Sequence, residues 1–363
     1  MTVLLDDALL DDPRRLQDAD AHGLLRAAAL AGAQVRSTVE AAAEGGIDRM
    51  IGSDRPRALV LLTRPGVGPA GAQLLAALLG PACPVPVVIA DVVPGWVGAL
   101  DVVFAYTDDP GDGVLAESVG LATRRGARVV MAAPEDGPAA QAAAGRALLL
   151  PQRVPVPHGL GFARVLAAGL VTLTTLGLLR TDLDALADEL DREAERDHPM
   201  HESFVNPAKS LALRLADRTP LLWGLDHAAT AVAAHGALAL ASFSGIVADV
   251  AGYPQAVIRP ALHRAAINAT SQADIFADPD DDEGVPPRVL LLAVTQGPVA
   301  DAARRTASES LRGADVIAPA EEVTGDEAMR AALLAVRFDL AALYLGLAAG
   351  RLGGPGIVSP AAL

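Results

Sequence analysis

The spacing of hydrophobic residues changes along the chain from a helical pattern to one that mixes strands and helices. Apolar residues recur every three or four positions through residues 13–50, which is typical of amphipathic helices, and Gly45-Gly46 is a stop signal near the end. From residue 58 onward, short apolar runs alternate with turns and helical segments. This alternation predicts βαβ units and a parallel sheet. The predicted strands of the first half are residues 58–63, 85–91, 100–106 and 127–133, and its predicted helices are residues 72–80, 114–126 and 161–179.

The order of elements in the first half recurs in the second half. A charged helical stretch at residues 181–202, interrupted at Pro199, leads into the second half. Residues 276–287 form a predicted acidic loop within the second half. The repeated order, with little sequence identity, indicates an internal structural repeat. The predicted strands are residues 219–226, 288–294 and 314–319, and the predicted helices are residues 229–241, 299–313 and 326–350.

The chain length and the repeat together predict two α/β domains. A chain of 363 residues is long enough for two, since a domain usually holds about 150 residues. We expect a central parallel sheet in each domain, flanked by helices. The expected organisation is a helical N-terminal segment (1–50), a first domain (51–180), a helical connector (181–205), and a second domain with the C-terminal helix (206–363).

The composition predicts a soluble globular protein and argues against two kinds of partner. Hydrophobic residues make up 52% of the chain but aromatic residues only 3%, so the cores must consist of Ala, Val and Leu. The formal net charge of −15 repels nucleic acid and anionic membranes, so we expect neither as a partner. The longest apolar run, Val165–Leu179, is shorter than the ~20 residues needed to span a bilayer and predicts a buried helix.

The first residues and the cysteine content predict a cytoplasmic protein. The opening sequence MTVLLDDALLDD carries acidic residues where a secretory signal carries basic ones. Cys83 is the only cysteine, so no intramolecular disulfide and no multi-thiolate metal site can form. Lys209 is the only lysine, and arginine is a poor proton acceptor, so a mechanism that needs a lysine base has one candidate.

Two turns are candidate anion sites, and the first is rich in glycine. Gly66, Gly68 and Gly71 follow a predicted strand and precede a helix, and Asp91 ends the next strand. Glycines let the backbone approach a pyrophosphate and a carboxylate binds ribose hydroxyls, so these residues fit a dinucleotide-binding turn. Pro69, however, removes one amide that would point at the phosphate. A tight βα turn without a ligand explains the same residues, and we favour that interpretation.

The second turn is acidic and occupies residues 107–113, between a predicted strand and a predicted helix. A helix N-terminus offers free amides and a partial positive charge that suit an anion. Here the sequence supplies its own carboxylates. We expect Asp108 or Asp109 to be the N-cap, with Pro110 at the first helical position.

The histidines are candidates for metal binding or proton transfer. His198 and His201, next to Glu202, could form part of a zinc site. The proline between the two histidines disrupts helical spacing, so a solvated end of the connector is the favoured interpretation and we predict no metal site. His158 and His263 are candidate general bases.

Five segments, in their order along the chain, resemble the bifunctional phosphoglucose/phosphomannose isomerase family over roughly residues 25–350. Proteins of that family have two consecutive sugar-isomerase (SIS) α/β domains after a helical N-terminus. The resemblance implies a parallel sheet flanked by helices in each domain and a sugar phosphate or related carbohydrate derivative as the ligand. We expect no cofactor. The segments are DVVPGWVGALDVVFAYTDD, RRGARVVMAA, VPHGLGFARVLAAG, VNPAKSLALRLADRTPLLWG and FDLAALYLGLAAG.

The resemblance also assigns candidate site residues. Arg164 matches the family's substrate-site arginine and is the first candidate catalytic residue. His158 and His263 are the other two, and His263 lies only near the position of the family's histidine. The candidate substrate-binding residues occupy the family's two phosphate loops and are Gly66, Gly68, Ala70, Tyr106, Thr107, Asp108 and Asp109.

The sequence departs from the family where the chemistry is expected. The first phosphate loop reads GVGPA at residues 66–70, without the family's serine, and the serine-rich second loop is replaced by AYTDDP at residues 105–110. The region of the family's catalytic glutamate falls near residues 239–245, which contain no acid. The chain ends VSPAAL, without the family's terminal lysine.

These departures predict a degenerate member of the family that binds a carbohydrate derivative or a protein partner, with weak or absent isomerase activity. Two alternatives stay open. One is an active aldose–ketose isomerase of hexose 6-phosphates in which Arg164 acts with His158 or His263, and the other is a nucleotide-binding or protein-interaction module. We also expect a homodimer, with helices 161–179 and 326–350 as candidate interface elements because they carry more apolar residues than one face needs.

Overall fold

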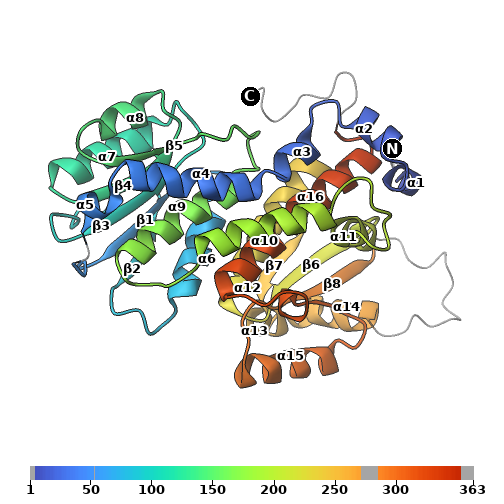
Figure 1. The fold of residues 1–363 in the computed structure, drawn as a ribbon. Helices are drawn as coiled ribbons and strands as arrows, with labels where there is room; N and C mark the ends of the chain where they lie inside the picture. The colour runs from blue at the N-terminus through green and yellow to red at the C-terminus, as the bar shows by residue number, and fades with distance from the viewer. Residues whose placement is uncertain (1–4, 53, 271–284, 353–363) are drawn as a thin grey trace, which may run out of the picture. The chain divides into compact units, whose positions relative to one another are not determined.

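The chain forms two compact units, each built on one parallel β-sheet (Figure 1). The unit of residues 29–191 contains strands β1 to β5, and we call it the β1–β5 unit. The other unit contains strands β6 to β9 and combines residues 1–28 with the second half of the chain from Arg192; we call it the β6–β9 unit. The structure is a computed structural model that describes residues 5–52, 54–270 and 285–352.

The sheet of the β1–β5 unit has the strand order β2-β1-β3-β4-β5, with all neighbours parallel. The runs LVLLT and VVFAY are almost entirely buried as β1 and β3, as expected of parallel strands covered on both faces. The elements are α4 (Ala31–Glu44), α5 (Ile47–Ile51), β1 (Leu59–Thr63), α6 (Gly68–Leu79), β2 (Val87–Ala90), β3 (Val102–Tyr106), α7 (Gly113–Arg124), β4 (Arg128–Ala133), α8 (Pro138–Ala143), β5 (Leu148–Pro151) and α9 (Phe162–Thr175), and α10 (Leu183–Arg196) leads out of the unit.

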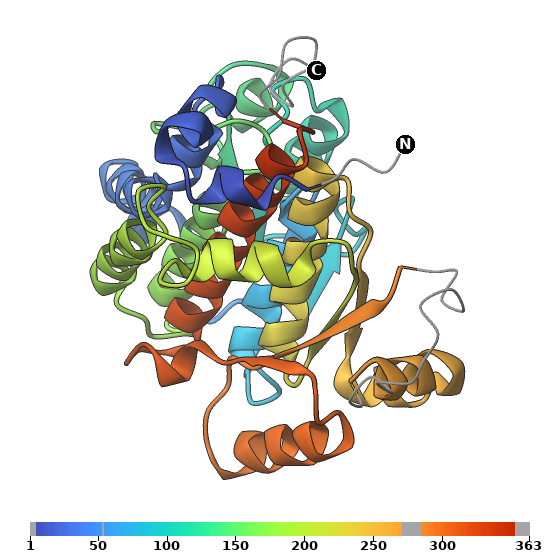
Figure 2. The same cartoon turned by 90° about the vertical axis from the view of Figure 1, so that its right-hand side faces the viewer.

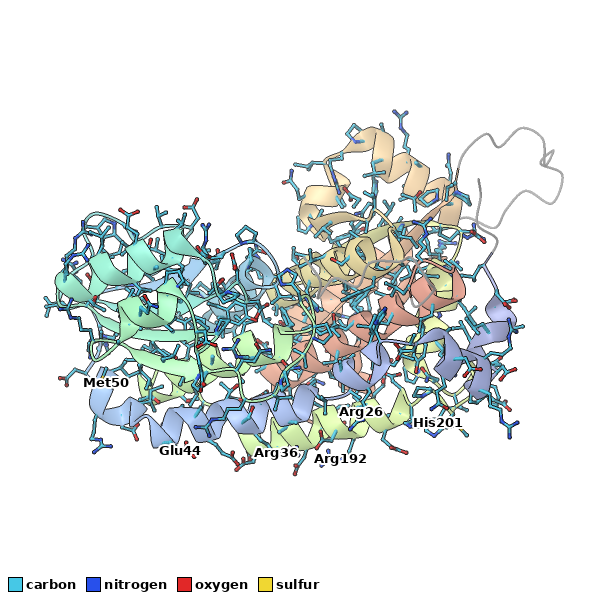
Figure 3. The ribbon with its side chains drawn as sticks, turned by 90° about the horizontal axis from the view of Figure 1, so that it is seen from above. Arg26, Arg36, Glu44, Met50, Arg192 and His201 are labelled. Atoms are coloured by element: carbon cyan, nitrogen blue, oxygen red, sulfur yellow. The ribbon has the colours of Figure 1, made fainter. Side chains whose placement is uncertain are left out.

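Helices cover both faces of this sheet. α7 and α8 pack on one face over a core of Val, Leu, Ala and Met side chains, and α9 with α4 and α6 covers the other. Arg36 and Glu44 lie along the outer side of α4 (Figure 3), where Arg36 pairs with Asp188 and Asp191 at 2.7 Å each. The polar side of α4 therefore faces the middle of α10.

The sheet of the β6–β9 unit has the order β7-β6-β8-β9, again all parallel. Its order matches that of the first four strands of the other sheet, so the internal repeat is confirmed. The elements are α1 (Asp7–Leu10), α2 (Pro13–Ala19), α3 (Leu24–Ala28), α11 (Pro207–Leu215), β6 (Thr219–Gly224), α12 (His227–Ala239), β7 (Asp249–Gly252), α13 (Tyr253–Val257), α14 (Pro260–Thr270), β8 (Pro287–Leu292), α15 (Pro298–Ser310), β9 (Asp315–Ile317) and α16 (Glu327–Ala348).

The long helix α16 is the core helix of the β6–β9 unit. It lies alongside α12, and α11 crosses it (Figure 2). Among the described residues it is the one helix long and apolar enough to cross a membrane, but its apolar stretch is entirely buried inside the structure. Its length and composition are therefore explained by a position in the core.

Two expectations about apolar helices have different outcomes. The run Val165–Leu179 is predicted to be a buried helix, and most of it forms α9, whose residues from Phe162 to Leu173 are all buried. The prediction that helices 161–179 and 326–350 form a dimer interface is wrong, because α9 and α16 are already covered by other helices of the same chain. The homodimer itself stays a prediction, which light scattering would test.

The predicted elements of the sequence are present within the described residues. Every predicted strand has a counterpart, and the helical N-terminal segment 1–50 is helical, although the division between the units falls inside it, after Ala28. β5 and β7 were not predicted. Residues 276–284 of the predicted acidic loop lie outside the described residues. The terminal sequence VSPAAL also lies outside them.

Candidate functional site

The topology of the β1–β5 unit marks one edge of its sheet as the place for a ligand. The chain leaves β1 through α6 toward β2, and leaves β3 through α7 toward β4, on the opposite side. In open parallel sheets, ligands bind outside the carboxyl ends of the strands at such a switch point. The turns there are residues 64–67 after β1 and residues 107–112 after β3. Most of the predicted site residues lie in or beside these turns.

Asp112 caps helix α7 and joins the two turns. Its Oδ1 accepts a hydrogen bond from the Leu115 amide at 2.9 Å, and its Oδ2 accepts one from Arg64 Nε at 2.8 Å and one from the Thr107 hydroxyl at 3.3 Å. Because Asp112 is 6% exposed, the pair with Arg64 is shielded from water. The Leu115 amide and the Arg64 guanidinium are thus occupied by a carboxylate of the chain itself.

The expected N-cap of α7 is wrong. The helix begins at Gly113, so Pro110 is not at its first position, and neither Asp108 nor Asp109 is the cap. Asp109 instead closes a tight turn: its amide donates to Thr107 Oγ1 at 3.1 Å, and its carboxylate accepts from the Gly111 amide at 2.7 Å. This local turn delays the start of the helix and leaves the capping position to Asp112.

Asp108 belongs to a second cluster, with Tyr106 and Arg164. The Tyr106 hydroxyl donates to Asp108 Oδ1 at 2.5 Å, and Arg164 Nη1 lies 3.7 Å from the same oxygen. Arg164 is 3% exposed, and its Nη2 donates to the carbonyls of Ala133 and Leu150 at 2.8 and 3.0 Å. Burial, and then the negative charge of Asp108, raise the pKa of Tyr106 well above its usual range, so Tyr106 remains a hydrogen-bond donor. The arginine is thus anchored through Nη2, whereas its buried Nε and Nη1 make no hydrogen bond to a described residue.

Glycines bring the remaining predicted residues close to these clusters. Gly66 has φ +110°, and a Cβ there would lie 3.5 Å from the His158 ring, so the exposed His158 lies beside the β1–α6 turn. Gly68 borders Tyr106, and Ala70 is buried in the first turn of α6. A Cβ at Gly161 would lie 2.5 Å from the Tyr106 hydroxyl, which explains why the start of α9 needs a glycine. The structure thus collects all the predicted substrate-binding residues, together with Arg164 and His158, at one edge of the sheet.

The third candidate base, His263, is in the other unit. It lies on α14, where its ring stacks on Trp223 of β6 with a centroid distance of 6.2 Å, and the Trp223 indole donates to Asp249 at 2.9 Å. His263 therefore belongs to the β6–β9 unit, whereas the turns after β1 and β3 belong to the β1–β5 unit. Residues 239–245, near which the resemblance implies the family's catalytic glutamate, form the end of α12 and a π-helical turn (Leu240–Ser244) in which Leu240, Phe243 and Ser244 are buried.

The other polar candidates have structural partners. Lys209, in the first turn of α11, is buried and donates to the carbonyls of Leu10, Pro199 and His201 at 2.5, 2.8 and 2.6 Å, so it is unsuited to act as a base. His201 Nδ1 lies 3.1 Å from the Arg196 carbonyl. Over the described parts of the chain, no group of three or more His, Cys, Asp or Glu residues could hold a metal ion.

Asp226 performs in the β6–β9 unit the role that Asp112 performs in the β1–β5 unit. Its Oδ1 accepts from the Ala229 amide at 2.7 Å and caps α12, and its Oδ2 accepts from the amides of Val294 and Thr295 at 2.8 and 3.0 Å. It thereby joins the turn after β6 to the turn after β8. Asp226 is not among the residues predicted from the sequence, although an aspartate between an apolar strand and an alanine-rich helix is a usual N-cap signal.

Two parallel sheets of matching strand order, each flanked by helices, define a protein with the tandem SIS fold. No protein-family profile matches the chain, and no curated protein matches it in sequence. Solved structures do match it along nearly their whole length. They include the C-terminal domain of glucosamine-fructose-6-phosphate aminotransferase from Francisella tularensis (12% identity, TM-score 0.62, covering 94% of this chain and 97% of that one).

Two further structures are similar to the same extent. One is a protein from Silicibacter pomeroyi that is provisionally described as a phosphosugar isomerase (15% identity, TM-score 0.64, covering 91% of this chain and 98% of that one). The other is a hypothetical protein from Thermus thermophilus (13% identity, TM-score 0.66, covering 97% and 92%). At these identities the likeness concerns the fold.

Proposed function

We propose that this protein binds a carbohydrate derivative and does not isomerise hexose 6-phosphates. The tandem SIS fold, shared with sugar-phosphate proteins, supports a carbohydrate ligand. The observation that carries the second half of the proposal is the occupation of the β3–α7 turn by carboxylates. Asp109 takes the Gly111 amide, and Asp112 takes the Leu115 amide and the Arg64 guanidinium.

The energies involved are large enough to exclude tight phosphate binding at this turn. A carboxylate about 5 Å from a phosphate repels it by about 1–3 kcal/mol at effective dielectric constants between 80 and 20. Each hydrogen bond that the phosphate cannot form costs a further ~1–3 kcal/mol. Millimolar to micromolar affinity corresponds to about 4–8 kcal/mol, so the repulsion and the lost hydrogen bonds together offset much of it.

The catalytic groups expected of an isomerase are also few at this edge of the sheet. His158 is the one candidate base that lies beside the β1–α6 turn, and it is exposed. Arg164 is tied to two backbone carbonyls. Loss of a positioned acid or base lowers a rate by roughly a hundred to ten thousand-fold. We therefore expect turnover near background.

A coupled assay that starts from fructose 6-phosphate and detects glucose 6-phosphate tests the proposal, with an active phosphoglucose isomerase as the positive control. Calorimetric titration with glucose 6-phosphate measures binding under the same conditions. We expect background turnover and a dissociation constant in the millimolar range or weaker. Robust turnover that is lost in His158→Ala or Arg164→Lys would contradict the proposal and establish the alternative of an active isomerase with a rearranged site.

A further inference from the structure

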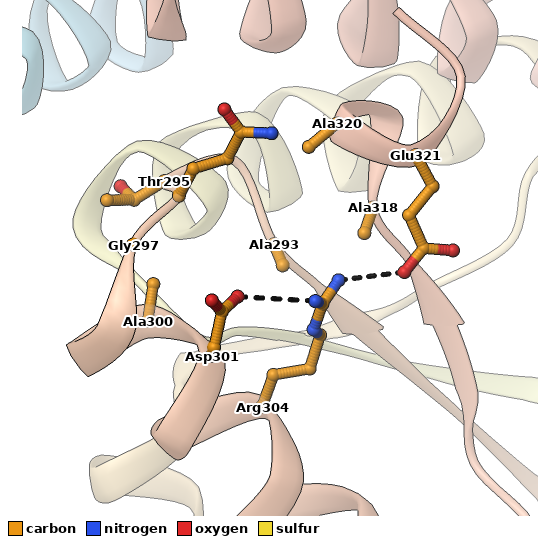
Figure 4. Close-up of a pocket in the computed structure, with 10 residues that line it drawn as sticks. Ala293, Thr295, Gly297, Ala300, Asp301, Arg304, Ala318, Ala320 and Glu321 are labelled. Atoms are coloured by element: carbon orange, nitrogen blue, oxygen red, sulfur yellow. Dashed lines mark hydrogen bonds and ion pairs between the residues drawn. The ribbon is translucent and has the colours of Figure 1, made fainter.

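A cavity opens at the carboxyl edge of the second sheet, inside the β6–β9 unit (Figure 4). It consists of two adjoining hollows of about 300 and 180 Å³ that share the wall formed by Ala293, residues 295–297 and Ala300. The larger hollow reaches Asp226 after β6, and the smaller one reaches Glu321 beyond β9. We call the two together the β8 cavity. Its place is the switch point of this sheet, since β6 leads to β7 on one side and β8 leads to β9 on the other.

Polar side chains with unused hydrogen-bonding capacity line the β8 cavity. Arg304, on α15, crosses one side and bonds to Asp301 at 3.3 Å and Glu321 at 2.9 Å (Figure 4). Gln296 Oε1 accepts from the buried Arg330 at 3.3 Å, which leaves the Gln296 amide nitrogen as a donor. Within the described residues, the Thr295 hydroxyl and that amide nitrogen bond to no other protein group. The cavity therefore presents both donors and acceptors.

The charges of the lining select the class of ligand. In the smaller hollow two carboxylates face one guanidinium, and the larger hollow adds the carboxylate of Asp226, so the lining has an excess of negative charge. That excess disfavours a phosphate. A hydroxyl group can donate to Asp301 or Glu321 and accept from Arg304, so it satisfies both kinds of partner. The alanine side chains of the wall suit the C–H faces of the same molecule.

We propose that the β8 cavity binds an uncharged, hydroxyl-rich molecule of monosaccharide size. The volume of the larger hollow is at the lower end of the roughly 300–1,000 Å³ that small-molecule sites occupy, which limits the ligand to about one sugar ring. This inference rests on the proposed carbohydrate binding and assigns it a place in the β6–β9 unit. It also states a preference, for the unphosphorylated sugar over its phosphate.

Saturation-transfer NMR and calorimetry on the full chain test the inference, with glucose, galactose, mannose and N-acetylglucosamine as neutral probes and glucose 6-phosphate as the charged one. Ala300→Leu fills the shared wall, and Ala302→Leu, an exposed position of the same helix that does not line the cavity, is the matched control. We expect a neutral probe to bind at least tenfold more tightly than glucose 6-phosphate. Ala300→Leu should weaken the binding of the neutral probe at least tenfold, and Ala302→Leu should weaken it less than twofold. If Ala300→Leu does not fold, Thr295→Val removes a ligand hydrogen bond with little change in volume.

A second variant tests the charge argument separately. Glu321→Gln removes one carboxylate from the lining and should reduce the preference for the neutral probe over glucose 6-phosphate by several-fold. Sugar binding that is equal in Ala300→Leu and Ala302→Leu would overturn the cavity assignment and leave carbohydrate binding intact. Binding of glucose 6-phosphate in preference to neutral sugars, lost in Ala300→Leu, would overturn the ligand class. Failure of every probe to bind would contradict the proposed function as well.

Discussion

Asp197, which follows α10, should make the stability of the β6–β9 unit depend on pH. Its side chain is 1% exposed; Oδ1 accepts from the Ala208 amide at 2.8 Å, and Oδ2 accepts no hydrogen bond among the described residues. Burial, and then the negative charge of Glu193, raise the pKa of Asp197 to about 8. Glu193 itself pairs with Arg337 at 2.7 Å and with Arg196. We therefore expect the folded protein to hold a proton on Asp197 near neutral pH.

The sign and size of the effect follow from the two pKa values of Asp197. In the unfolded chain its pKa is about 3.9, so between about pH 4 and pH 8 the folded state binds more protons than the unfolded state. The stabilising contribution is complete below about pH 4 and is lost as the pH rises to about 8. Within that window the free energy of unfolding falls by up to about 1.4 kcal/mol per pH unit. From pH 6.0 to pH 7.5 this amounts to about 2 kcal/mol.

Urea unfolding at pH 5, 6, 7 and 8 measures the effect in the wild-type protein and in Asp197→Asn, which keeps an acceptor for the Ala208 amide and cannot ionise. As the pH rises, the free energy of unfolding of the variant should increase relative to that of the wild type by about 1 kcal/mol or more per pH unit. Asp184→Asn, at an exposed position of α10, is the matched control for the exchange of an aspartate for an asparagine. A difference that is constant with pH for Asp197→Asn would refute the reasoning, since it would mean that Asp197 is ionised in the folded protein.

Three further substitutions test contacts that the structure describes, each by urea unfolding. Gly161→Ala places a Cβ 2.5 Å from the Tyr106 hydroxyl and should cost about 1–3 kcal/mol, whereas Gly145→Ala, with open space around it but a positive φ, should cost about 1 kcal/mol. Lys209→Met leaves three carbonyl groups without their donor and should cost at least about 1–3 kcal/mol; an unchanged midpoint would contradict the described bonds. Asp226→Ala removes the acceptor of three amides and should cost about 2–4 kcal/mol, more than Asp226→Asn.

The sequence predicts the sheets well because their strands are continuous apolar runs separated by turn signals. LVLLT and VVFAY are short apolar runs between turn signals, a pattern that predicts buried strands. Both form buried strands in the structure. β7 lacks that signal, and β5 shows it over only three leucines before Pro151. β7 reads DVAG, in which the aspartate and glycine are unfavourable in strands, and it forms because β6 offers it an edge. β5 is a four-residue segment that forms because β4 offers it an edge to pair with.

The members of the candidate site were predictable, but their partners were not. Two glycines and an acidic turn after successive strands are sufficient to place residues at one edge of a sheet. Which aspartate caps α7 depends on Arg64, which lies 48 positions away in the sequence and bonds to Asp112. The burial of α16 likewise depends on α11 and α12, so its apolar sequence alone could not distinguish a core helix from an interface helix.

The affinity of glucose 6-phosphate for Asp112→Ser, compared with that for the wild type, tests most directly the claim that the protein's own carboxylates exclude a phosphate. Serine can still cap α7, and the substitution both removes a negative charge and releases Arg64 from its partner. A gain of about 1–3 kcal/mol is expected, which is a dissociation constant about 5–150-fold lower, without a gain in fructose 6-phosphate turnover. Tight binding by the wild type that is weakened in Asp112→Ser would contradict the account.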